Sequence, residues 1–108
     1  MVYFSFEDFC EKASLCHVMT RQDEIECAKQ MKRGDTIARE KLIQSYMPMV
    51  AEHIKRSKPH IQNLGLVLYC LQALEKAVDS FDFFQDREPF SHRLSWWLRQ
   101  AVTNYIVR

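Results

Sequence analysis

Apolar residues recur along this chain every three to four positions, which is the spacing of an amphipathic α-helix. Between Ile43 and Ile54 the apolar positions follow i, i+3, i+4, i+7 and i+11, so they share one helical face. The segment 64–81, LGLVLYCLQALEKAVDSF, is apolar on nearly all sides, and we predict that it is the central, most buried helix. A last apolar stripe consists of Leu94, Trp97, Leu98, Ala101, Val102 and Tyr105. The pattern predicts an all-α protein.

Two pairs of residues near the N-terminus have the spacing of a helix capping box. Ser5 precedes Asp8 by three positions, and Thr20 precedes Asp23 by the same interval. In such a box the hydroxyl accepts a hydrogen bond from the backbone N–H of the later residue and satisfies a free donor of the first turn. We therefore predict one helix over residues 6–14 and a second that begins at about residue 21.

Glycine and proline mark the predicted helix ends. Gly34 should end the second helix, because glycine tolerates the left-handed backbone that closes a helix. The carboxylate of Asp35 can then cap the third helix. Pro48 lies inside that helix, and since proline lacks an N–H and clashes with the preceding turn, we predict a kink or break there. A loop over 82–89 should separate the central helix from the last one, which starts at about Ser91.

The composition is that of one ordinary globular domain: 108 residues, 47% apolar and 27% charged. Only 2 glycines and 3 prolines are present, which favours long elements over an all-β fold. We predict a single compact bundle of about five helices. Its core is predicted to contain Leu66, Leu74, Val78, Leu94, Trp97, Leu98 and Val102. The formal net charge of +1 argues against tight, nonspecific DNA binding driven by charge alone.

The last helix also has a second face of different chemistry. Its members follow i, i+3, i+7, i+10 and i+14 and are Arg93, Trp96, Gln100, Thr103 and Val107. An amide can pair with a base edge, a hydroxyl with a phosphate or base, and an indole can stack on an unpaired base. On spacing alone, the commoner explanation is a tryptophan that only lies across a neighbouring loop.

The segment PFSHRLSWWLRQAVTNYI resembles the signature helix of region two of bacterial RNA polymerase sigma factors. The residues that match this signature directly are Phe90, Ser91, Trp96, Trp97, Arg99, Gln100, Ala101 and Thr103. LEKAVDSFD and TRQDEIECAKQMKRGDTIAREKLIQSYMPMV are similar to the helices before it, so the resemblance covers nearly the whole chain. It implies an N-terminal helix and linker over 1–19 and a region-two-like domain over 20–108.

The resemblance further implies a transcription initiation factor domain, not an enzyme. Such a domain docks on the clamp of the RNA polymerase core and binds the non-template strand of the minus-ten promoter element as the DNA melts. Gln100 and Thr103 would contact the upstream edge of the element, and Trp96 and Trp97 the junction between paired and melted DNA. Phe90 would lie near a captured base. Arg99 would contact a phosphate.

Two segments depart from the family pattern. Arg93 stands where the family has a tyrosine that stacks on the flipped adenine, so base selectivity should differ. In the polymerase-docking helix, the family's polar residues are replaced over positions 65–70. We predict an exposed apolar patch there, and the candidate partner-binding residues are Gly65, Leu68, Tyr69 and Gln72.

The apolar docking helix leaves alternatives open. The patch could mark a degenerate sigma-like module that binds itself or a regulator such as an anti-sigma factor. The N-terminal helix, with Phe4, Phe6 and Phe9, could instead cover the patch as a lid. A polar outer face on this helix would favour polymerase docking, and an apolar one would favour the interaction module. The regions that contact the minus-thirty-five element are not among these residues, so we expect either an excised domain or a shortened relative.

Neither a cofactor nor a metal site is predicted. The four cysteines, Cys10, Cys16, Cys27 and Cys70, lack a Cys-x-x-Cys pair or finger spacing, and we expect reduced thiols. No Gly-rich nucleophile turn is present to indicate an enzyme. No apolar run has the length of a membrane span, and MVYFSFEDFC lacks the features of a signal peptide. We therefore expect a cytoplasmic protein without membrane contacts.

Overall fold

The computed structural model describes residues 3–84 and 88–107, and every regular element within them is a helix. In chain order the elements are α1 (Phe6–Ser14), α2 (Arg21–Lys32), α3 (Thr36–Ser45), α4 (Met47–Lys55), the short 3₁₀ helix η1 (Pro59–Ile61), α5 (Leu64–Ser80) and α6 (Phe90–Val107). The predicted all-α fold is confirmed. The predicted loop over 82–89 falls partly outside the described residues, at 85–87.

The helix starts follow the local capping signals. The Ser5 hydroxyl accepts from the Asp8 N–H at 3.0 Å, and the Thr20 hydroxyl accepts from the Asp23 N–H at 3.1 Å. The first box differs from the standard form, because the Asp8 carboxylate accepts from the N–H of Phe4, one residue before the cap. Each cap satisfies an N–H that the helix itself leaves without a partner.

α2 ends and α3 begins at the glycine and the aspartate at which the sequence predicted these helix ends. Gly34 has φ of 90°, in the left-handed region, and Asp35 Oδ1 accepts from the N–H groups of Ile37 and Ala38 at 3.0 and 3.1 Å. The third predicted helix is divided at Tyr46 into α3 and α4, and Pro48 lies in the first turn of α4. A proline at a helix start removes only an N–H that would be free anyway. This division makes six α-helices among the described residues instead of about five.

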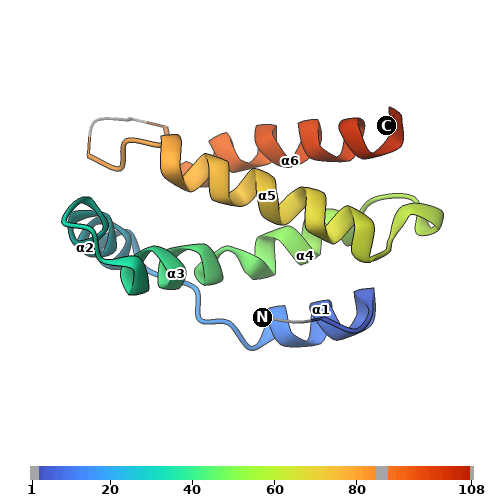
Figure 1. The fold of residues 1–108 in the computed structure, drawn as a ribbon, viewed down its shortest axis with the longest axis horizontal. Helices are drawn as coiled ribbons and strands as arrows, with labels where there is room; N and C mark the ends of the chain where they lie inside the picture. The colour runs from blue at the N-terminus through green and yellow to red at the C-terminus, as the bar shows by residue number, and fades with distance from the viewer. Residues whose placement is uncertain (1–2, 85–87, 108) are drawn as a thin grey trace.

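The helices form a layered bundle (Figure 1). α5 and α6 run side by side in opposite directions along one side, α4 and α3 lie beneath α5, and α1 packs against α4 on the far side from α6. α2 packs on α3 at one end, while η1 and the C-terminal turn of α6 lie at the other. α6 therefore has one long face free of other helices.

One hydrophobic core joins all these layers. Of the predicted core residues, Leu66, Leu74, Val78, Leu94 and Leu98 are fully buried. Trp97 and Val102 are only partly buried and pack against the edge of the core. Phe9 of α1 is fully buried in the same cluster, so the N-terminal helix contributes to this core. In the part of the chain that is described, no helix is long and apolar enough to span a membrane.

Candidate nucleic-acid interface

The last helix, α6, separates cleanly into a buried face and an exposed face. The buried residues on it are Phe90, Leu94, Leu98, Ala101 and Tyr105. The opposite row is exposed at every position that the spacing predicted, namely Arg93, Trp96, Gln100, Thr103 and Val107. Because the buried face holds the helix against α5, the exposed row is presented on a rigid backbone.

The two adjacent tryptophans occupy different environments. Trp96 is 49% exposed, whereas Trp97 is partly buried against the core. Their rings are 5.5 Å apart between centroids and nearly perpendicular, at 85°. Trp97 therefore supports the side of Trp96, and Trp96 keeps an open ring on which a planar group can stack. The predicted order of exposure, Trp96 above Trp97, is confirmed.

Trp96 lines two hollows in which Arg93 also takes part. One of about 380 Å³ is formed with Glu88, His92, Arg93 and Arg99. A second of about 330 Å³ is formed with Arg93, Trp97, Phe81 and Ser80. Both contain Arg93, so a guanidinium and an indole line the same surface depressions. This combination offers a cation and an aromatic platform together, which single-stranded nucleic acid binding uses.

A third hollow, of about 390 Å³, lies between α5 and α6 and joins the two predicted surfaces. From α6 it includes Trp96, Trp97, Gln100, Ala101 and Asn104, and from α5 it includes Tyr69, Gln72, Ala73 and Lys76. The predicted DNA face and the predicted partner face are therefore adjacent. Lys76 and Asn104 were not predicted as site residues. The signal that could have found them is helical spacing, because each lies four positions after a predicted residue, Gln72 or Gln100.

Arg99 lies on the part of α6 that approaches α4. Burial is the main reason why the pKa of His53 lies below its usual value, and the positive charges of Arg56 and Arg99 lower it further. Arg56 ends α4 and Arg99 belongs to α6, so two cations from different helices act on one imidazole. Two positive charges therefore lie near His53, beside the exposed row of α6.

No protein-family model matches the chain. Over 94 residues, which take in 83% of the chain, it is 34% identical to the RNA polymerase sigma factor SigA of Clostridium acetobutylicum. Most of this chain is a sigma-factor-like region. The alignment covers 24% of SigA, so the chain spans about a quarter of the length of this curated relative.

In this sigma-like chain, Phe90 is an interior residue. Its side chain is 3% exposed and contacts the rings of Tyr46, Phe81 and Phe83, with centroids 4.7, 5.1 and 5.3 Å away. Periodicity did not reveal this cluster, because its members come from three separate segments. The ring of Phe90 anchors the start of α6 and is not itself available to DNA in this arrangement.

Gly65 in the sigma-like chain is explained by packing. A Cβ atom at this position would lie 2.9 Å from the hydroxyl of Tyr105 and 3.1 Å from Oδ1 of Asn63. Tyr69 is partly buried, with its ring 5.2 Å from that of Tyr105 in an edge-to-face arrangement. Two of the four candidate partner residues thus contribute to the α5–α6 contact.

The outer face of α5 is mixed in character. Leu68 is 58% exposed, and the other exposed positions on the helix are Gln72, Glu75, Lys76, Asp79 and Ser80. Asp79 accepts two hydrogen bonds from Arg39 of α3, at 2.8 and 2.9 Å. The predicted lid is only partial, because Phe9 is buried while Phe4 and Leu68 remain exposed. The predicted apolar patch is therefore small, and most of this face is polar.

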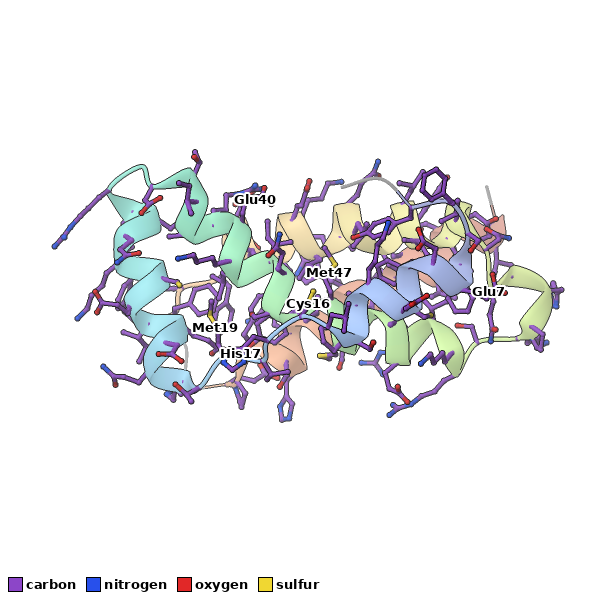
Figure 2. The ribbon with its side chains drawn as sticks, turned by 90° about the horizontal axis from the view of Figure 1, so that it is seen from below. Glu7, Cys16, His17, Met19, Glu40 and Met47 are labelled. Carbon is purple, nitrogen blue, oxygen red and sulfur yellow. The ribbon has the colours of Figure 1, made fainter. Side chains whose placement is uncertain are left out.

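The cysteines are free thiols in inert surroundings. Burial raises the pKa of Cys10, Cys16 and Cys27 and raises the pKa of Cys70 to about 12, so each stays protonated at neutral pH. Figure 2 shows Cys16, His17 and Met19 along the connection from α1 to α2, where they line a hollow of about 200 Å³ with Lys41 of α3. Across the described ranges, no three His, Cys, Asp or Glu side chains are placed to hold a metal ion.

Proposed function

We propose that this chain is a transcription initiation factor domain that binds promoter DNA together with the RNA polymerase core. The exposed face of α6 recognises the minus-ten element and stabilises its melted non-template strand. The observation that carries this proposal is the row of Arg93, Trp96, Gln100 and Thr103, exposed on a helix whose other face is locked in the core. The similarity to SigA supports it. A cytoplasmic location is part of this proposal.

In this proposal each side chain of the exposed row makes the DNA contact that its chemistry allows. Trp96 stacks at the junction where paired DNA gives way to melted DNA, and Trp97 holds it from the side. Gln100 and Thr103 contact base edges at the paired, upstream end of the element. Arg93 faces the unpaired base, and Arg99 contacts a phosphate. Phe90 positions the start of α6 from within the core and acts through that helix.

The outer face of α5 is the proposed surface for the polymerase clamp. Leu68 and Gln72 are its exposed candidates, and the polar residues that follow them along the helix favour docking over burial in a homodimer. Gly65 and Tyr69 shape this face through their contacts with Tyr105. No cofactor takes part in this proposal.

The proposal is tested by titrating the chain into a fluorescently labelled non-template oligonucleotide that carries a minus-ten element, with core polymerase present. Trp96→Ala should weaken binding by about 1–3 kcal/mol, which is roughly 5- to 150-fold. Phe4→Ala is the matched control, because Phe4 is an aromatic residue that is 82% exposed but lies before α1. Equal affinity of wild type and Trp96→Ala would contradict the proposal.

One observation, the exposed Leu68, favours a second candidate: a sigma-like module that associates with itself or a regulatory partner. Leu68→Gln separates the two ideas. Under the polymerase proposal, wild type sediments as a monomer and the variant loses affinity for core polymerase. Under the alternative, wild type is a dimer that Leu68→Gln dissociates, while polymerase capture is weak for both proteins.

A further inference from the structure

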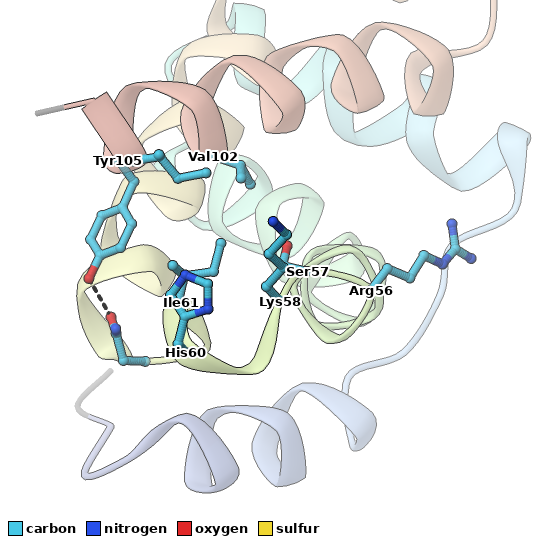
Figure 3. A pocket seen from close by; sticks show the side chains of 9 residues that line it. Arg56, Ser57, Lys58, His60, Ile61, Val102 and Tyr105 are labelled. Carbon is cyan, nitrogen blue, oxygen red and sulfur yellow. Dashed lines mark hydrogen bonds between the residues drawn. The ribbon is translucent and has the colours of Figure 1, made fainter.

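A hollow lies at the end of the molecule opposite to α2, and its described lining includes none of the residues discussed above as DNA contacts. It has a volume of about 740 Å³ and is bounded by the end of α4, η1, the start of α5 and the last turn of α6 (Figure 3). Val102 and Ile106 of α6, with Ile61, supply its apolar side chains. Arg56, Lys58 and His60 supply its polar rim.

The charge of this hollow has one sign. Its lining holds the cations Arg56 and Lys58, with His60 beside them, and none of the described residues that line it has a carboxylate side chain. Within the described part of the chain, neither Arg56 nor Lys58 forms an ion pair with an acidic side chain. Asn63, the N-cap of α5, also lines the hollow, so the positive end of that helix faces it. The C-terminal ends of α4 and α6 lie there too and have the opposite partial charge, so the positive sign comes from the side chains of Arg56 and Lys58. The chemistry fits an anionic ligand.

The hollow continues the surface of α6 that faces DNA in the proposed function. Arg99, Val102 and Ile106 follow i, i+3 and i+7 on α6, so the side chains of this helix that line the hollow continue one helical row from Arg99. From Trp96 to Ile106 the helix rises by about 15 Å, at 1.5 Å per residue. That distance corresponds to about four base pairs of B-form DNA. With Trp96 at the junction and Thr103 toward the paired side, the hollow lies beside DNA that is still double-stranded.

We propose that this hollow holds the phosphate backbone of the DNA duplex about four base pairs beyond the melted junction. The inference rests on the proposed function, because it places Trp96 at that junction. Arg56 and Lys58 neutralise adjacent phosphates of one strand, and Val102 and Ile106 contact the deoxyribose between them. An acidic protein segment shares part of this chemistry, but the continuity with the α6 face favours DNA.

The test compares, with core polymerase present, two forked promoter fragments that share one single-stranded minus-ten segment and differ in their paired arm, and a separate titration measures the affinity of the chain for core polymerase alone. The short arm has about two base pairs, closed by an uncharged covalent linker so that the strands stay paired, and the long arm extends for about ten base pairs and so reaches past the hollow. The variant carries Arg56→Gln and Lys58→Gln. The matched control carries Lys29→Gln and Arg33→Gln, which removes the same charge from exposed positions at the α2 end of the bundle.

Wild type and control should bind the long-arm fork about five to ten times more tightly than the short-arm fork, and the variant should bind both equally. In the long-arm fork the variant should also lower the slope of log K against log salt by about 2, since each lost phosphate contact accounts for about 0.9. Unchanged melting temperatures would confirm that the variant is folded.

Three results would overturn the inference. The first is that the longer arm adds no affinity in wild type, and the second is that the variant loses affinity equally for both forks. The third is that the variant loses affinity for core polymerase while it binds both forks as before. The last result would assign the hollow to a protein partner. In all three, a Trp96-dependent affinity for the short fork would leave the proposed function intact. If wild type binds neither fork, the proposed function itself fails, and this inference with it.

Discussion

The hydroxyl of Tyr105 donates a hydrogen bond to Oδ1 of Asn63 at 2.8 Å, which joins the last turn of α6 to the start of α5. The same oxygen accepts from the Leu66 N–H at 3.1 Å and so caps α5. One tyrosine therefore helps to set how the two longest helices meet, and its hydroxyl occupies the space above Gly65 where a side chain would lie.

Tyr105→Phe should lower the free energy of unfolding by about 1 kcal/mol, the usual net contribution of one such hydrogen bond. The ring and its contact with Tyr69 are retained, so the fold should persist. Asn63→Ala should cost more, because the cap of α5 is lost as well, which adds about 1 kcal/mol. Urea denaturation followed by circular dichroism measures both. A larger loss for Tyr105→Phe than for Asn63→Ala would contradict the shared role of the Asn63 oxygen.

The two tryptophans should differ in their effect on stability. Trp97→Ala should cost about 2–3 kcal/mol, below the full range for a buried tryptophan, because Trp97 is only partly buried. Trp96→Ala should cost less than about 1 kcal/mol, since the side chain is 49% exposed. Thermal melts of both variants measure the loss of stability. Equal losses for the two variants would show that the faces of α6 are misassigned.

Phe90→Ala should be among the most damaging single changes, at about 3–5 kcal/mol, because it opens a cavity within the aromatic cluster. Phe84→Ala is the control: this ring is 42% exposed and mainly covers the ammonium of Lys32, 4.5 Å from its centroid. It should cost at most about 1 kcal/mol. Chemical denaturation distinguishes the two, and a mild Phe90→Ala variant that lost only DNA binding would instead point to a direct contact.

The pKa of His53 should lie below its usual value of 6.5 because of burial and the charges of Arg56 and Arg99. A folded-state pKa that is depressed means that the unfolded chain binds the proton more readily. The stability contributed by neutral His53 is therefore present above pH 6.5 and is lost as the pH falls from there through the lower folded-state pKa. His53→Gln should flatten this part of the pH–stability curve.

NMR titration of the His53 ring gives the matching measurement. Arg99→Gln and Arg56→Gln should each raise its pKa, because each removes a nearby positive charge. Arg93→Gln should leave it unchanged, since Arg93 lies toward Trp96 and the Phe81 side of α6. An unchanged His53 pKa in Arg99→Gln would show that Arg99 lies apart from Arg56 and from the hollow to which the DNA backbone is assigned.

Arg93 should determine which unpaired base is preferred. Its guanidinium lines two hollows with Trp96, so it can reach a base that stacks there. Arg93→Tyr should sharpen the preference for adenine, because a tyrosine ring offers stacking where the guanidinium offers charge. Affinities for non-template oligonucleotides that differ at one base measure this. An identical base preference in both proteins would place position 93 away from the unpaired base.

The local structure of this protein could be predicted from short stretches of sequence. The caps at Ser5, Thr20 and Asp35 and the stop at Gly34 each depend on residues within a few positions, so neighbours in sequence suffice to identify them. The two faces of α6 follow from helical period alone. The exposed tryptophan and its polar row were identified in the same way.

The tertiary structure decided which of these residues can meet a ligand. Phe90 matched the sigma signature yet is enclosed by rings from two other segments, which supply Tyr46 and the pair Phe81 and Phe83, and Gly65 is constrained by a tyrosine forty positions later. Packing also brings Arg56 and Lys58 together with Ile106, which lies far from them in the sequence, and the three form a hollow only because α4, η1 and α6 converge. Helical period determines which face of its own helix a side chain occupies. Whether that face is covered, and what stands beside it, depends on packing between segments whose contacts no local pattern records.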